Sequence, residues 1–220
     1  MSARRTLGLL LLAAGMLLCG AAGWHYLQGD LAQHQAQAEF ARRIARPPAS
    51  PGVPRVIPAA NAGAASRPTP EPAQAPAYPY GEPLARLRIP VAGIDQIVFG
   101  GCDPATLTRG PGHVPGTALP GADGPPRNCV ITGHRDSHFR RLGWLKPGNL
   151  VELETPTGRT TYRIVEREIV KPDAVSVLAP TREPRLTLIT CYPFTFIGAA
   201  PERLVLIAAP VRGGAGPHRS

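Results

Sequence analysis

The sequence contains few aromatic residues, few cysteines and no dense run of basic side chains. Of its 220 residues, only 5% are Phe, Trp or Tyr and only four are cysteines. Four cysteines in a chain of this length do not form a disulfide scaffold. The formal net charge of +9 is not gathered into a basic patch interleaved with aromatics, so nucleic acid is not the expected partner. We also find no internal repeat, and the composition excludes a collagen or a coiled coil.

Proline and glycine are abundant instead, with 27 and 24 copies. Many of the prolines fall within residues 47–83, where large apolar side chains are scarce. Such a segment cannot bury enough apolar surface to offset the entropy of ordering it. We therefore predict a Pro-rich linker over 47–83, the alternative being an irregular domain edge.

The N-terminus carries an apolar segment that predicts export. Arg4 and Arg5 precede an uncharged run of residues, which is about as long as a helix needs to cross a bilayer. We predict a cytoplasmic N-terminus over 1–5 and a transmembrane signal anchor over 6–27, with the following chain outside the cytoplasm. Two alternatives are a cleaved signal peptide and a lipoprotein signal at Cys19, and the bulky Leu18 disfavours the latter.

Two further segments flank the body of the chain. Residues 28–46 are rich in Ala and Gln and contain no proline before position 47, which predicts a short juxtamembrane helix. Residues 213–220 are predicted to be a disordered tail. The membrane is thus an expected partner through the N-terminal helix.

Residues 84–212 read as one domain made of short strands. Each candidate is rich in Val, Ile, Leu or Thr and is bounded by Gly, Pro, Asn or Asp, and helical segments between them are brief. This spacing favours an all-β fold, a closed or nearly closed β-barrel with a few short helices. The strand candidates are 86–91, 94–99, 128–132, 150–153, 160–170, 186–190 and 203–208, and the helical ones are 104–109, 138–145 and 173–178.

Three residues in this domain could share one chemistry. Cys191 ends an apolar run, His134 follows another run and a glycine, and Arg203 opens the strand after Cys191. If those last two strands pair antiparallel, Arg203 lies beside Cys191. Taken singly, the thiol could fill the core and the other two could be solvated. Together, an imidazole favours the thiolate and can protonate a leaving amine, while a cation meets negative charge on the scissile oxygen.

The motifs GPGHVPGTALPG, CVITGHRDSHFRRL, LTLITCYPF and PERLVLIAAP, in this order, resemble those of sortases, most of all class D. This resemblance implies an eight-stranded sortase barrel without a cofactor. It also implies that Cys191 is the nucleophile, His134 the general acid and base, and Arg203 an aid to substrate and oxyanion. The Tyr192 N–H would be a second oxyanion donor and Thr190 a contact in the substrate groove.

The resemblance further implies cleavage of a Leu-Pro-x-Thr-type sorting signal after the Thr through a thioester. An amine on a cell-wall or pilin acceptor would then resolve that thioester. Other readings stay open: a thiol hydrolase or protease without transfer, or a silent module that binds surface peptides.

Three details also stay open. His113 is a rival for the base, and Cys102 and Cys129 are either a disulfide or two thiols. We expect no metal site, since His134 and His138 do not lie within a helix.

Overall fold

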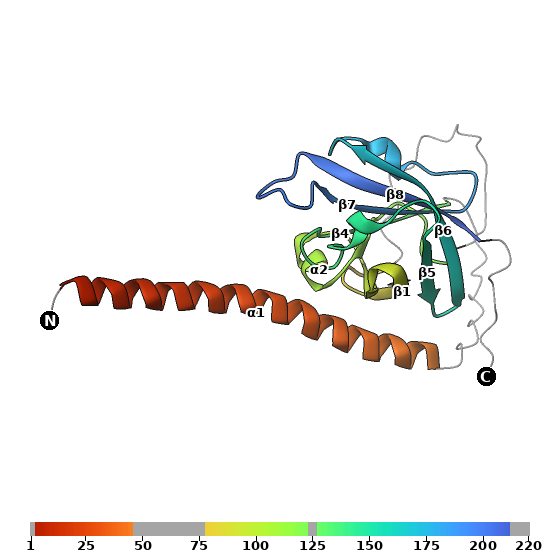
Figure 1. Ribbon diagram of the computed structural model, residues 1–220. Coiled ribbons are helices and arrows are strands. Elements are labelled where there is room, and N and C mark those ends of the chain that lie inside the picture. Colours follow the sequence, from red (N-terminus) through yellow and green to blue (C-terminus); the bar gives the residue numbers. More distant parts are fainter. Residues whose placement is uncertain (1–2, 46–77, 123–126, 212–220) are drawn as a thin grey trace, which may run out of the picture.

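The computed structural model describes residues 3–45, 78–122 and 127–211, and it shows a closed barrel of eight strands with one long helix against it (Figure 1). The strands follow one another around the barrel in the order β1-β2-β3-β4-β7-β8-β6-β5. This confirms the predicted sortase-like barrel. The strands are β1 (Pro83–Ile89), β2 (Ile94–Gly100), β3 (Gly112–His113), β4 (Asn128–Gly133), β5 (Leu150–Thr155), β6 (Gly158–Val170), β7 (Arg185–Tyr192) and β8 (Glu202–Pro210).

Alternation of apolar and polar residues explains the first strand. In β1 every second side chain is buried in the barrel core, including Leu87 and Ile89. The outward-facing Arg86 makes a two-pronged hydrogen bond to Asp95 on β2, at 2.7 and 2.8 Å. A strand with period-two burial fits a sheet of which one face is dry.

Two parts of the barrel differ from the sequence prediction. The motif GPGHVPG contains the two-residue strand β3, which pairs parallel to β2 and antiparallel to β4. Of the expected helix over 138–145, only a single 3-10 turn forms. Helix α2 (Pro104–Arg109) matches its prediction, and the side chain of Asp103 caps it by accepting from the Thr106 N–H at 3.0 Å. The 3-10 turns are η1 (Pro90–Ala92), η2 (Leu142–Trp144) and η3 (Val175–Leu178).

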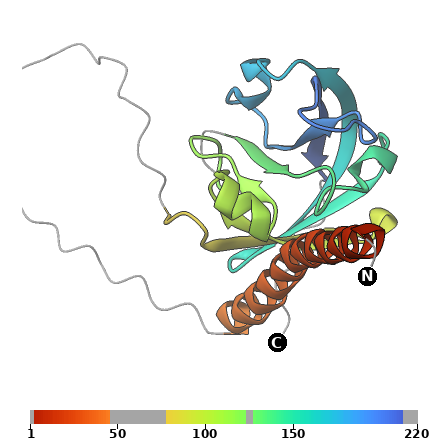
Figure 2. The same cartoon turned by 90° about the vertical axis from the view of Figure 1, so that its left-hand side faces the viewer.

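The long helix α1 (Ala3–Ala45) rests on the barrel with its C-terminal half, while its N-terminal half extends beyond it (Figures 1 and 2). Phe40 is 2% exposed and packs with Ile97 and Phe99 of β2. The buried amide of Gln33 binds the Ile97 backbone from both sides, accepting from its N–H at 2.8 Å and donating to its carbonyl at 3.1 Å. Residues 28–45 are therefore part of the folded body.

The predicted anchor over 6–27 lies within helix α1. Within the described part of the chain, no helix is both long enough and apolar enough to cross a bilayer.

The predicted linker and tail fall largely outside the described residues, which omit 46–77 and 212–220. The end of that linker belongs to the barrel, because the Gly81 N–H donates to the Gly100 carbonyl at 2.8 Å and the Tyr78 hydroxyl bonds to His113. Residues 78–83, at the end of the predicted linker, thus contact the barrel.

Candidate active site

Strand pairing places Arg203 directly opposite Cys191. Strands β7 and β8 are antiparallel, with Cys191 paired to Arg203 and Tyr192 to Glu202. Side chains of directly opposed residues lie on the same face, with Cβ atoms about 4.5–5.5 Å apart. The register confirms the antiparallel pairing that the sequence predicts, and it places the Arg203 side chain on the same face as the half-buried side chain of Cys191.

A parallel pair of strands brings His134 to the same end of the barrel. In the β4–β7 ladder the last aligned pair is Gly133 and Thr190. His134 and Cys191 are the next residues on these two neighbouring strands, so they occupy adjacent positions. His134 is exposed and Cys191 is partly exposed, as a reacting pair must be to meet a substrate. The structure thus gathers all three predicted residues at one end of the barrel.

Thr190 fixes the relative position of these two strand ends. Its hydroxyl donates to the Gly133 carbonyl at 2.7 Å, and the residue is only 1% exposed. A Cβ at position 133 would lie 2.9 Å from the ring of Phe139, so this approach requires glycine. Thr190 therefore ties β7 to β4, and it has almost no surface left for the substrate contact that the sequence analysis expected.

An arginine that the sequence analysis passed over holds the loop between Cys191 and Arg203. Arg135 Nη1 donates to the Pro193 carbonyl at 2.8 Å, and Arg135 Nη2 donates to the carbonyls of Phe196 and Gly198 at 2.5 and 2.9 Å. The residue follows His134 directly, so one loop both carries the imidazole and fastens the β7–β8 loop. The available signal was the position of Arg135 in the motif GHRD.

Comparison with known proteins decides the family. The family model described as Sortase domain matches residues 87–211, which include all three gathered residues. The chain belongs to the sortase family. This is a family of cysteine transpeptidases.

Sortases of several classes are similar to this chain, class D among them. Sortase D of Bacillus subtilis (strain 168) is 29% identical over 204 residues, which cover 92% of this chain and 96% of that protein. The structure of a Clostridium perfringens Sortase D5 transpeptidase has a TM-score of 0.54 and 26% identity, covering 60% of this chain and 81% of its own. A C. perfringens sortase C, solved with the C-terminal cell wall sorting motif, has a TM-score of 0.55 and 26% identity, covering 60% and 72%.

The guanidinium of Arg203 in this sortase is held by the loop that precedes it. Its Nη1 donates to the carbonyls of Ala200 and Glu202, at 3.1 and 2.9 Å. Tyr192 packs edge-on against Phe194, with ring centroids 6.2 Å apart and planes at 83°. Its role as an N–H donor to an oxyanion stays a prediction.

The rival histidine is buried and fully engaged. His113 is 1% exposed, and its Nε2 lies 2.8 Å from the Ala118 carbonyl and 3.1 Å from the Thr117 hydroxyl. Its Nδ1 bonds to the Tyr78 hydroxyl. Burial lowers the pKa of His113, and burial also raises the pKa of Tyr78 to about 12. Since this imidazole has no surface for a substrate, its place in the sortase barrel is structural.

The remaining cysteines are free thiols. All four cysteines of the chain are unpaired, so Cys102 and Cys129 form no disulfide. Burial raises the pKa of the Cys129 thiol to about 12, and burial with the nearby Asp103 raises that of Cys102. Both thiols are therefore kept protonated, unlike a nucleophile. Among the described residues, no three His, Cys, Asp or Glu side chains are grouped to hold a metal ion.

Proposed function

We propose that this sortase cleaves an LPxTG-type sorting signal through a thioester on Cys191 and transfers the acyl group to an amine. The supporting observation is the placement of Cys191 opposite Arg203 and adjacent to His134. A cysteine that only filled the core would not lie at an exposed end of the barrel next to both an arginine and a histidine. The substrates would be surface proteins with a C-terminal sorting signal, and the acceptor would be an amine of the cell wall or of a pilin.

In the acylation step, the Cys191 Sγ attacks the carbonyl carbon of the Thr in the signal. The C–N bond to the next residue breaks, and His134 delivers a proton to the departing amine. Negative charge develops on the carbonyl oxygen meanwhile, and Arg203 would stabilise it. Losing one such oxyanion donor typically costs about 3 kcal/mol in the barrier.

In the second step, the acceptor amine attacks the thioester carbon. His134, now neutral, takes the proton that the amine loses, and the C–S bond breaks to return the thiol. Water in place of the amine gives hydrolysis, so the outcome depends on how well the acceptor competes. The solved sortase C with a cell wall sorting motif supports the substrate class.

Such substrates are found at the cell surface, and an apolar run follows the basic residues Arg4 and Arg5. We therefore place the catalytic domain outside the cytoplasm. Measuring protease access to the domain in intact cells tests this location, and full protection in cells with a permeable envelope would contradict it.

The activity is tested by incubating the full chain with a series of quenched LPxTG-like peptides, with and without an added amine. We expect cleavage, and an amine adduct of the acyl fragment by mass spectrometry. Cys191→Ala should abolish cleavage, whereas Cys102→Ala, a matched thiol outside the site, should retain it. Cleavage without any adduct would favour the hydrolase alternative, and peptide binding without cleavage would favour the binding module.

A further inference from the structure

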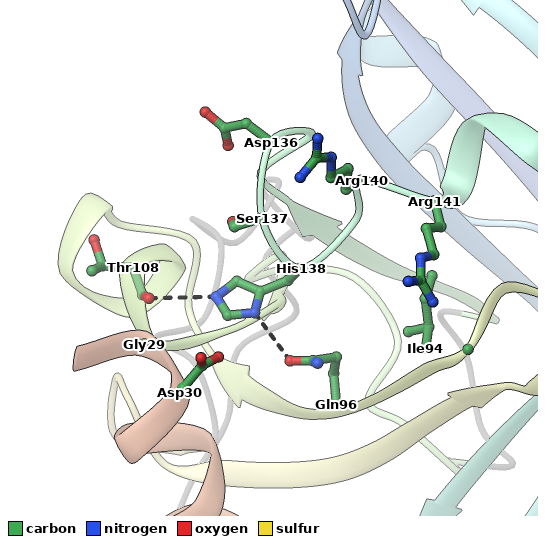
Figure 3. Close-up of a pocket in the computed structure, with 11 residues that line it drawn as sticks. Gly29, Asp30, Ile94, Gln96, Thr108, Asp136, Ser137, His138, Arg140 and Arg141 are labelled. Atoms are coloured by element: carbon green, nitrogen blue, oxygen red, sulfur yellow. Dashed lines mark hydrogen bonds between the residues drawn. The ribbon is translucent and has the colours of Figure 1, made fainter. Parts of the chain in front are cut away.

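His138 lies where the loop after β4 meets strand β2, helix α2 and helix α1 (Figure 3). Its Nδ1 is 3.0 Å from the side-chain oxygen of Gln96 on β2, and its Nε2 is 3.4 Å from the Thr108 carbonyl on α2. The imidazole is half-buried in this position. The side chain of His138 therefore joins its loop to two other elements of the fold.

Helix α1 closes a further side of this imidazole. Gly29 is buried, and a Cβ at that position would lie 3.9 Å from the Cε1 atom of His138 and 3.2 Å from the Thr108 carbonyl oxygen. A side chain much larger than a methyl group would displace either the helix or the imidazole. The lack of a side chain at Gly29 thus lets α1 approach His138 closely.

Both ring nitrogens of His138 are bonded whether or not the ring is charged. Burial lowers the pKa of His138, and the charge of His134 adds to this effect. The carboxylates of Asp30 and Asp136 act in the opposite direction. Nε2 faces a backbone carbonyl, which only accepts, so it carries a hydrogen. The side-chain amide of Gln96 can donate to Nδ1 of a neutral ring or accept from a charged one, so the contact persists in both states.

The position of His138 is transmitted to His134 through a short closed loop. The Phe139 N–H donates to the His134 carbonyl at 3.0 Å, and the fully buried ring of Phe139 packs against Gly133. Arg135 fastens the same loop to the carbonyls of the β7–β8 loop. The loop is therefore held from two sides, by Arg135 at the β7–β8 loop and by His138 at β2 and α2.

His134 needs such anchors because its own side chain is exposed. Asp136 and Ser137, between the two histidines, are exposed as well. A misplacement of a catalytic group by about 1 Å can cost about 10²-fold in rate. The reach of the His134 imidazole toward Cys191 thus depends on how firmly the rest of the loop is fixed.

We propose that His138 is a positioning residue, which holds the loop after β4 so that the imidazole of His134 stays within reach of Cys191. The inference rests on the proposed function, in which His134 moves protons at the thiol and at the amine. Helix α1 contributes to the positioning, since Gly29 lies against the imidazole of His138.

The kinetics of peptide cleavage by the full chain test this role. His138→Ala should lower kcat about 10- to 100-fold and change KM less than about twofold, because a displaced His134 weakens the transition state and not the binding of the peptide. His138→Gln should recover most of kcat, since its side-chain amide can donate to the Thr108 carbonyl in place of Nε2. His34→Ala, at an exposed histidine of α1, is the matched control and should keep the wild-type kcat. A wild-type kcat in His138→Ala, or no recovery in His138→Gln, would overturn the proposal.

A substitution on α1 tests the same contact from the other side. Gly29→Leu should displace the imidazole and lower kcat as His138→Ala does, whereas Ala38→Leu, at an exposed position of the same helix, should not. In the double variant of Gly29→Leu and His138→Ala the two losses should not add, because both act through one contact. Additive losses would refute the contribution of α1.

Alkylation of Cys191 keeps this test apart from the test of the activity. A neighbouring imidazole favours the thiolate, which attacks iodoacetamide and expels iodide. Followed by mass spectrometry without any peptide, the modification of Cys191 should slow in His138→Ala by a factor similar to that in His134→Ala, and it should keep its rate in His34→Ala. Slower modification in His134→Ala alone would overturn the positioning role. If both rates fall as expected but the wild type cleaves no peptide, the proposed function fails, while the positioning of His134 by His138 stands.

Discussion

Replacing Gln33 by alanine tests how strongly helix α1 is fixed to the barrel. Gln33 is 6% exposed, and its amide satisfies three backbone groups: the Ile97 N–H, the Ile97 carbonyl and the Arg109 carbonyl, the last at 2.9 Å. Each buried group left without a partner costs about 1–3 kcal/mol. The substitution costs less than the sum of these three terms, because α1 can separate from the barrel and let water hydrate the three backbone groups.

The expected loss is therefore limited by the free energy of docking α1. Burying a side chain such as Phe40 contributes about 1.5–3 kcal/mol to that docking. We expect Gln33→Ala to lower the local stability around β2 by about 2–3 kcal/mol, which corresponds to about 30- to 150-fold faster hydrogen exchange at the Ile97 amide. NMR or mass spectrometry of the full chain measures this exchange directly.

Gln37 offers a matched control one turn further along α1. It is only partly buried and makes a single long hydrogen bond, from its Nε2 to the Asp95 carbonyl at 3.4 Å. Gln37→Ala should change the exchange of Ile97 by less than about threefold, the effect of a weak and partly hydrated contact. Unchanged exchange in Gln33→Ala, or equal acceleration in both variants, would show that the amide does not hold the helix.

Three other outcomes are expected. His134→Ala and Arg203→Ala should each reduce peptide cleavage at least about 10²-fold, since each removes a transition-state role, and near-normal rates would refute that assignment. Arg135→Ala should lower kcat/KM about 30-fold, because the β7–β8 loop loses the hydrogen bonds that hold it. Arg135→Lys should restore only part of that loss, and the control Arg163→Ala, at an exposed position on β6, should leave kcat/KM unchanged. A wild-type kcat/KM in Arg135→Ala would show that the loop keeps its position without this arginine. Because burial lowers the pKa of His113, the unfolded chain binds its proton more readily, so the free energy of unfolding should fall as the pH drops below 6.5. In His113→Gln, the free energy of unfolding from denaturant titrations should depend less on pH. If its pH dependence matches that of the wild type, His113 is not the group responsible.

The sequence predicts the thiol and its arginine well because their relation is local. Cys191 and Arg203 lie on consecutive strands joined by one loop, so an antiparallel register follows from the chain itself. The position of His134 is different, because β4 and β7 are parallel and far apart in sequence. No periodicity indicates that pairing, and only the likeness to sortases places the histidine beside the cysteine.

Other features have no clear local signal. Strand β3 consists of Gly112 and His113 within a run of glycine and proline, so hydrophobic alternation cannot reveal it. Thr190 looks like a polar strand end that could face a substrate, yet its hydroxyl is buried on Gly133. The docking of α1 depends on Gln33, whose amide is matched to backbone groups 64 positions away. When the hydrogen-bond partners of a buried polar side chain lie far away in the sequence, the sequence alone predicts that the side chain is exposed.

The order of the strands also bears on when the protein becomes reactive during its synthesis. β7 and β8 are the last two barrel strands in chain order, and they fill the gap between β4 and β6. Pairing of distant segments is slow compared with local folding. A nascent chain that ends before Glu202 thus carries its thiol on an open edge without its cation. The proposed chemistry would therefore become possible only once β8 has paired with β7.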